Sequence, residues 1–206
     1  MKFYLSSYKI GNEPEKLKQL VSNGKIGYIS NALDFSSANK ERRKKHIESD
    51  ITDLRNLGLE VELLDLKAYF GKQSGLKKKI DKLGEVFVSG GNTFVLRQAM
   101  KLSGFDKIFK QLVKRKDFLY AGYSAGICVL APDLKALKIV DDPKDKPYRQ
   151  VKQTIWKGLG FLDYIILPHY KSNHPESADI DKEVEYCKKN KIPFKTLRDG
   201  EVIIIK

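Results

Sequence analysis

The sequence has few cysteines and no long apolar run, and both absences limit what kind of protein it encodes. Its 206 residues contain only Cys128 and Cys187, so a disulfide framework is excluded, and no paired Cys/His spacing predicts a zinc site. No stretch approaches the roughly 18 to 20 consecutive apolar residues that cross a bilayer, and residues 1–11 resemble a strand more than a signal peptide. We therefore expect a cytoplasmic protein, away from the membrane, whose cysteines are buried or reduced.

Basic residues outnumber acidic ones, but they form few clusters. The formal net charge is +13 at pH 7, which raises nucleic-acid binding as a hypothesis. Most of the excess is scattered lysine, with basic clusters at 41–46 and 77–79. The sequence lacks the arginine-rich stretches and the aromatic residues interleaved with charge that are typical of nucleic-acid sites. The charge therefore favours a solvated basic surface over a nucleic-acid site.

Short apolar runs alternate with amphipathic segments along the whole chain. Hydrophobic residues make up 41% and charged residues 32% of the sequence, as in folded globular proteins. Runs rich in β-branched and aromatic residues predict strands at 3–7, 27–30, 61–64, 86–89, 118–121, 164–167, 194–197 and 202–205. Amphipathic patterns predict helices at 13–21, 39–55, 93–101, 105–114 and 181–190.

This alternation predicts an α/β fold. Parallel strands joined by right-handed helical crossovers place helices on both faces of the sheet, which gives a three-layer sandwich with a mostly parallel sheet. No repeat, linker or low-complexity segment divides the chain, so residues 1–206 are expected to form a single domain.

The most informative motif is Gly122-Tyr123-Ser124-Ala125-Gly126, which has the pattern G-x-S-x-G. It follows an apolar strand and precedes an apolar helix, the context in which this pattern forms a nucleophile elbow. The sharp turn strains the serine backbone and needs small neighbours, and glycines flank Ser124 on both sides. Ser124 is therefore the candidate nucleophile.

A second glycine turn follows the strand at 86–89 and opens the next helix. In a parallel sheet, Gly90 and Gly91 then lie at the same edge as Ser124, so the backbone N–H groups of Gly91 and Ala125 are candidate donors to one oxyanion. Asn92 and Tyr123, which adjoin these donors, are the candidate substrate-binding residues. A phosphate-binding turn or a plain structural turn is the alternative for this segment, which matches neither a P-loop nor G-x-G-x-x-G.

A serine nucleophile needs a base, and the chain has three histidines. His46 lies among charged residues of a predicted helix, where we expect a solvated side chain. His169 ends a predicted strand at the carboxyl edge, whereas His174 lies in the polar loop that follows. His169 is therefore preferred as the base, and His174 is the alternative.

The acid that would orient the histidine has two possible places in the chain order. An α/β-hydrolase order of Ser, acid and His requires an aspartate between Ser124 and His169. These aspartates are Asp133, Asp141, Asp142, Asp145 and Asp163. The order Ser, His and acid uses Asp199, although its Asp-Gly pair is also typical of a hairpin turn.

Four segments in order resemble the signature of the peptidase E (dipeptidase E, S51) family of serine peptidases, which includes cyanophycinases. They are Gly90 to Phe94, Gly122 to Gly126, Leu167 to Tyr170 and Leu197 to Gly200, and their spacing is similar over nearly the whole chain. The resemblance implies the flavodoxin-like sandwich of class I glutamine amidotransferases, with serine replacing their nucleophilic cysteine. It also implies catalysis without a metal or organic cofactor.

Carried over by position, the resemblance makes Ser124 the nucleophile and His169 the base. Gly91 and Ala125 would supply the oxyanion hole. Asp199 falls where the family typically has a glutamate, and another aspartate proposed for the family's triad falls on Ala136, which favours Asp199 as the acid.

The segment after the histidine loop departs from the family. Aspartyl dipeptidases of the family carry basic residues there, whereas residues 177–183 of this chain include Asp179, Asp181 and Glu183. We therefore expect a preference that is broader than N-terminal aspartate or different from it.

Together these patterns predict a serine hydrolase that cleaves short peptides as an exopeptidase or dipeptidase. The alternative from another class is a non-catalytic module of the same fold that binds a peptide or small molecule. A basic nucleic-acid-binding protein is a third reading that rests on charge alone. The sequence leaves the oligomeric state open, with a homo-oligomer among the options.

Overall fold

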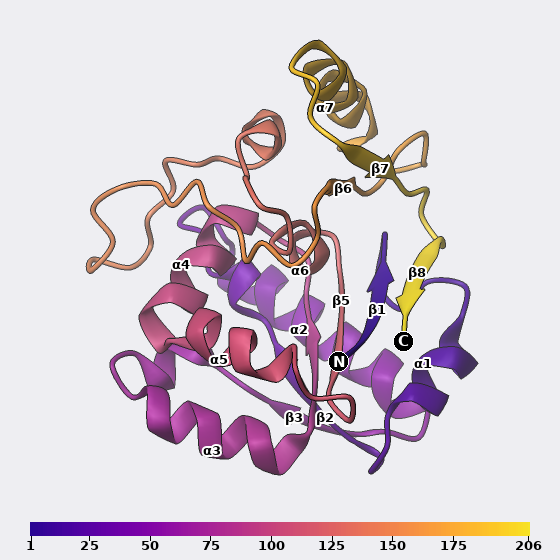
Figure 1. The fold of residues 1–206 in the computed structure, drawn as a ribbon, viewed down its shortest axis with the longest axis vertical. Coiled ribbons are helices and arrows are strands. Elements are labelled where there is room, and N and C mark those ends of the chain that lie inside the picture. Colours follow the sequence, from indigo (N-terminus) through magenta and orange to yellow (C-terminus); the bar gives the residue numbers. More distant parts are fainter.

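One central sheet contains strands from both ends of the chain (Figure 1). The computed structural model describes residues 1–206, and its six-stranded sheet has the order β3-β2-β4-β5-β1-β8. Every neighbouring pair is parallel except β1 with β8. The strands are β1 (Lys2–Ser6), β2 (Lys25–Ile29), β3 (Glu60–Leu63), β4 (Glu85–Val88), β5 (Leu119–Tyr123) and β8 (Val202–Ile205). β2 to β5 follow the flavodoxin-like order, and β1 takes the place of the fifth strand.

Helices cover both faces of this sheet. They include α1 (Pro14–Leu20), α2 (Lys40–Asn56), α3 (Gln73–Leu83), α4 (Thr93–Ser103) and α5 (Phe105–Leu112). Successive strand residues point to opposite faces, so Tyr4 packs with Leu17 of α1 and Ile47 of α2, whereas Phe3 packs in the cluster of α3, α4 and α5. The predicted three-layer α/β sandwich with a mostly parallel sheet is confirmed.

Two of the predicted strands lie outside the central sheet. β6 (Ile165–Leu167) and β7 (Phe194–Thr196) form a separate parallel pair, joined by α7 (Ser177–Lys189), which Figure 1 shows beside them. Residues 197–201 then lead from β7 to β8, which returns to the central sheet against β1. This return brings the turn that contains Asp199 to the carboxyl end of β1.

The remaining elements are short. α6 (Ala125–Cys128) follows β5 directly, and three 3₁₀ segments span Asn31–Leu33, Leu66–Tyr69 and Ala136–Ile139. Both cysteines are free and buried, as expected from the sequence. None of the helices is both long enough and apolar enough to cross a membrane.

A cleft of about 730 Å³ opens where the parallel strands end. Residues that follow β1, β2, β4, β5 and β6 line it, among them Tyr8, Leu33, Gly91, Ser124 and His169. The carboxyl ends of β2 and β4 are also where the strand order reverses, and ligands bind at such points in open α/β sheets. The fold therefore places the two glycine turns and the histidine loop around one cleft.

Candidate active site

Ser124 occupies a strained turn between β5 and α6. Its φ of 47° and ψ of −118° lie in a region that residues with a side chain rarely adopt. Its backbone N–H donates to the Ser7 carbonyl oxygen at 3.2 Å, and its partly exposed side chain lines the cleft. This is the backbone conformation that the G-x-S-x-G pattern predicts.

The two glycines of the motif allow β4 to approach this turn. A Cβ atom on Gly122 would lie 2.7 Å from the Val88 carbonyl oxygen, and a Cβ on Gly126 would meet the same oxygen even more closely. A larger residue at Gly122 would push β4 and β5 apart, and one at Gly126 would push α6 away from β4. The glycines are therefore required by packing as well as by the turn.

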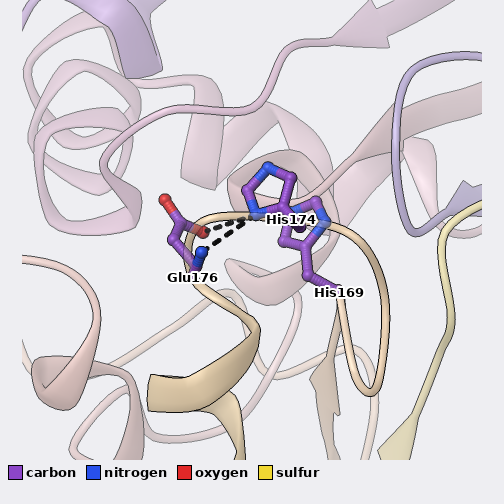
Figure 2. Close-up of side chains that lie close together, drawn as sticks. All are labelled: His169, His174 and Glu176. Carbon is purple, nitrogen blue, oxygen red and sulfur yellow. Dashed lines mark hydrogen bonds and ion pairs between the residues drawn. The ribbon is translucent and has the colours of Figure 1, made fainter.

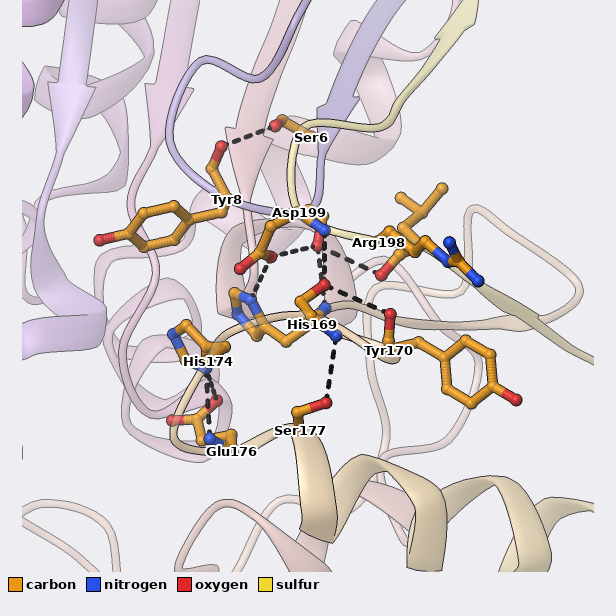
Figure 3. Close-up of polar contacts among 12 residues, drawn as sticks. Ser6, Tyr8, His169, Tyr170, His174, Glu176, Ser177, Arg198 and Asp199 are labelled. Carbon is orange, nitrogen blue, oxygen red and sulfur yellow. Dashed lines mark hydrogen bonds and ion pairs between the residues drawn. The ribbon is translucent and has the colours of Figure 1, made fainter.

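His169 and Asp199 form a hydrogen-bonded pair beside the cleft. The Nδ1 atom of His169 lies 2.7 Å from Oδ1 of Asp199 (Figure 3). The carboxylate can only accept, so Nδ1 carries the proton and Nε2 keeps a free lone pair. His169 is buried and has a φ of +61°, so its ring is held in place by a second strained backbone. A neutral imidazole with a free Nε2 is what a general base requires.

Ser7, at the end of β1, connects the segments that carry these residues. Its Oγ accepts a hydrogen bond from the His169 backbone N–H at 2.9 Å and lies 3.0 Å from Oδ1 of Asp199, to which it donates. Its carbonyl oxygen accepts from the Ser124 N–H. The sequence gives no motif for Ser7, because a lone serine after a strand has no distinguishing spacing.

No hydrogen bond joins the Ser124 hydroxyl to His169, although both residues line the same cleft. Hydrogen bonds of this kind are often long in ligand-free enzymes and tighten when substrate binds.

A second imidazole covers the first. The ring of His174 stacks on that of His169 with centroids 3.7 Å apart and planes 8° apart. The Nδ1 atom of His174 accepts from the Glu176 backbone N–H at 3.3 Å, and Tyr8 packs edge-on against both rings. Burial, and then the neighbouring His174, lower the pKa of His169, while Asp199 opposes this effect.

His169, His174 and Glu176 are the one group of side chains close enough to be tested as metal ligands (Figure 2). Their candidate ligand atoms all lie within 4.8 Å of one another. However, the lone pairs of a stacked pair lie in two parallel planes and do not converge on one point, and His169 Nδ1 already bonds Asp199. The arrangement therefore suits two neighbouring imidazoles better than a metal centre.

The backbone N–H groups of Gly91 and Ala125 have no acceptor within the protein. Gly91 has a φ of +131°, and a Cβ atom there would collide with the carbonyl group of Ala32. Ala125 is the first residue of α6, where helix N–H groups lack partners within the helix. Both donors are therefore available to a ligand.

The polar atoms of the two predicted substrate-binding residues bond to the protein itself. Asn92 caps α4 by accepting from two helix N–H groups, and its amide donates to the Asp142 carbonyl. The Tyr123 hydroxyl donates to Asp50 at 2.6 Å and lies 2.6 Å from His46 Nε2. Both residues line the cleft, but through atoms with structural partners.

His46 is partly solvated, as the sequence predicts, but it also has partners within the protein that the sequence does not predict. Its side chain is 33% exposed, bonds Tyr123 and lies 3.5 Å from Asp50. The charged residues around His46 in the sequence do not indicate these contacts. Its partners are Tyr123 of β5 and Asp50, one turn further along α2.

A model of Peptidase family S51 matches residues 15–206. The chain belongs to peptidase family S51. The family resemblance inferred from the four motifs is thus confirmed, and the protein is a peptidase.

Several S51 relatives are similar over much of their length. The uncharacterized peptidase Lmo0363 of Listeria monocytogenes is 34% identical over 71% of this chain and 68% of its own. Peptidase E of Streptomyces coelicolor is 29% identical over 59% of this chain and 49% of its own. A crystal structure titled as a putative peptidase E from Listeria monocytogenes has a TM-score of 0.75 at 22% identity, covering 100% of this chain and 98% of that one. At this identity the structural likeness supports the fold.

Proposed function

We propose that this S51 peptidase is a serine exopeptidase or dipeptidase that cleaves short peptides through an acyl-enzyme on Ser124. The observation that carries the proposal is the His169–Asp199 pair, which leaves Nε2 of His169 free in the cleft that contains Ser124. A nucleophile, a base and an acid that orients the base are the parts needed for covalent acyl transfer.

In the proposed reaction, Ser124 Oγ attacks the scissile carbonyl carbon while His169 Nε2 takes the hydroxyl proton. The N–H groups of Gly91 and Ala125 stabilise the oxyanion that forms. His169 then gives its proton to the leaving amine as the C–N bond breaks, which leaves an ester on Ser124. Water, deprotonated by His169, hydrolyses this ester and restores the serine. Asp199 holds the imidazole in the required tautomer throughout.

The polar groups of the cleft support a short, charged substrate. Arg42 lines the cleft, is exposed and has no acidic partner, so it is free to bind the carboxylate of a peptide C-terminus. Other parts of the wall carry the carboxyl groups of Asp141, Asp142 and Glu176. A cleft with both signs of charge suits a peptide with free termini.

Labelling with a fluorophosphonate tests the nucleophile. Intact-mass analysis and peptide mapping should find one label on Ser124 and none on the Ser124→Ala variant. Ser37→Ala is the matched control, because Ser37 is another exposed serine of the same cleft and should leave labelling unchanged.

The same variants, assayed on a panel of free dipeptides and chromogenic amides, test turnover. Ser124→Ala should lose nearly all activity while keeping the circular dichroism spectrum of the wild type. A label on another serine, or no label under conditions that modify a control hydrolase, contradicts the assignment. Peptide binding without any turnover would indicate the non-catalytic module instead.

A further inference from the structure

A small cavity of about 20 Å³ adjoins the active-site cleft behind Ser124. The two spaces share Ser124, Val140, Asp141 and Glu176 in their walls. A space of this size holds one water-sized group.

Three acidic residues line this cavity, and its wall contains no lysine, arginine or histidine, although the Glu176 carboxylate also lies 4.0 Å from Nδ1 of His174. Asp141 follows the 3₁₀ segment Ala136–Ile139, Glu176 precedes α7, and Glu183 lies two turns further along that helix. Glu176 and Glu183 are seven residues apart and therefore share one helix face. Asp141 bonds the Thr93 N–H at 2.8 Å through one of its oxygens.

Glu183 distinguishes this cavity from an ordinary acidic cluster. It is only 1% exposed, and neither of its carboxyl oxygens has a hydrogen-bond partner. The backbone N–H of Val140 approaches this carboxyl group and opposes the rise in its pKa, but the two groups do not form a hydrogen bond of ordinary geometry. Buried carboxyl groups are normally paired, because leaving one without a partner costs several kcal/mol. Glu183 is thus a buried acceptor that lines a cavity and lacks a donor.

From this arrangement we infer that the cavity binds the ammonium group of a basic side chain, of the lysine or ornithine type, on the acyl residue of the substrate. The inference rests on the proposed function, because it places that residue beside Ser124. An ammonium group offers three donors and one positive charge to the carboxyl groups that face it.

The size of the cavity favours a side-chain ammonium over the peptide's α-amino group. An α-amino nitrogen is attached to a branched carbon that also carries the side chain and the carbonyl. A lysine or ornithine nitrogen ends an unbranched methylene stem, which fits a narrow opening. The substrate residue whose carbonyl meets Ser124 is also the one nearest to the opening of the small cavity, because Ser124 and Ala125 line that cavity.

Matched dipeptides test this inference. Norleucine has a stem like that of lysine without the ammonium group, so Lys-Leu and Orn-Leu are compared with Nle-Leu. We expect wild-type kcat/KM to favour Lys-Leu over Nle-Leu by about 30-fold or more, as for a buried charge pair. Glu183→Gln should remove most of this preference and leave Nle-Leu within about twofold. Glu185→Gln, at an exposed position on the same helix, should change neither value.

Three results would overturn the inference. One is equal kcat/KM for Lys-Leu and Nle-Leu in the wild type. Another is a preference that survives Glu183→Gln. The third is an equal fall of kcat/KM for both dipeptides in Glu183→Gln, which would assign the cavity to the α-amino group of the peptide.

A binding measurement separates the inference from the proposed function. Calorimetry on Ser124→Ala, which needs no turnover, should show tighter binding of lysinamide than of norleucinamide, and Glu183→Gln in that background should remove the difference. If no dipeptide is cleaved but this difference is found, the proposed function fails, and only the assignment of the cavity to a basic side chain stands. If dipeptides are cleaved and the two amides bind equally, the inference fails alone. A third outcome would assign the cavity to an inorganic ion. In that case the two amides bind equally, and potassium chloride raises the stability of the protein with Glu183 but not that of the Glu183→Gln variant.

Discussion

The imidazole of His174 lies flat on that of His169, with ring centroids 3.7 Å apart. His169 and His174, the two candidates for the base in the sequence, therefore lie together in the structure. His169 bonds Asp199, and the ring of His174 covers that of His169. The ring of His174 keeps water away from its neighbour, and any proton that His174 takes up further raises the cost of protonating His169. His169 consequently stays neutral, and able to act as a base, at lower pH than a free histidine.

Replacing His174 should move the pH profile more than it lowers the maximal rate. His174→Ala removes the ring that covers His169 and the neighbouring group that competes with it for a proton, so the pKa of His169 should rise and the acidic limb of kcat/KM should shift to higher pH. His174→Phe keeps the cover and should give a smaller shift. An unchanged profile in both variants, or a His174→Ala enzyme as inactive as His169→Ala, would contradict this role.

Asp199 is expected to control the tautomer of His169. Asp199→Asn keeps the shape but favours the wrong tautomer, so kcat should fall by up to about 10⁴-fold. Asp199→Glu restores the carboxylate and should retain more activity. Glu201→Gln is the control, because Glu201 bonds the Arg198 N–H in the same turn. An Asp199→Asn enzyme that keeps more than about a third of wild-type kcat would mean that another carboxylate orients the histidine.

Ser7 is expected to act as a positioning residue. Ser7→Ala leaves the buried His169 N–H without an acceptor, so the free energy of unfolding should fall by about 1 to 3 kcal/mol. Misalignment of the imidazole should lower kcat by about tenfold or more, with KM little changed. Ser6→Ala, which removes only a bond to the Tyr8 carbonyl, should keep wild-type kcat. Equal kcat in the two variants would argue against the positioning role.

Glu183 should make the ligand-free protein less stable as pH rises. Burial, then Asp141 and Glu176, raise its pKa from 4.5 to about 9, so the folded protein holds a proton that the unfolded chain releases above pH 4.5. Its stabilising contribution is therefore full below pH 4.5 and is lost as pH rises toward 9, by at most about 1.4 kcal/mol per pH unit. Urea unfolding between pH 5 and 8.5 should show a flatter dependence for Glu183→Gln than for Glu185→Gln. Parallel curves would exclude a protonated Glu183.

Much of the fold could be predicted from the sequence because its strands carry clear apolar runs. The order of elements follows from the alternation of strand-like and helical segments. The two faces of the sheet follow from the alternation of side chains along each strand, and Phe3 and Tyr4 pack on opposite faces. α3 is absent from the sequence-based prediction, although Leu76, Ile80 and Leu83 have helical spacing, because four lysines lie between them and Gly75 precedes them. Nothing in the apolar runs at 165–167 and 194–196 distinguishes strands of a separate pair from strands of the central sheet.

The candidate site was predictable where a local motif exists. Ser124 and Gly91 belong to turns whose backbone demands show in the sequence, and His169 ends a strand. Ser7 and the stacked position of His174 depend on contacts across the chain, which no spacing encodes. The Asp-Gly pair at Asp199 is typical of a plain turn. Only the return of the chain from β7 to β8 brings Asp199 beside β1.

The insertion of β1 between β5 and β8 also decides when the site comes into existence during synthesis. Ser7 is synthesised before Ser124, His169 and Asp199, yet it contacts all three. The Ser124 turn can form against β4 and β5 while the chain is incomplete. The imidazole of His169 and the carboxylate of Asp199 are fixed only after β8 pairs with β1. Such long-range contacts form late in folding. A nascent or truncated chain therefore carries the serine without the orienting pair, so hydrolytic competence would appear only with the finished fold.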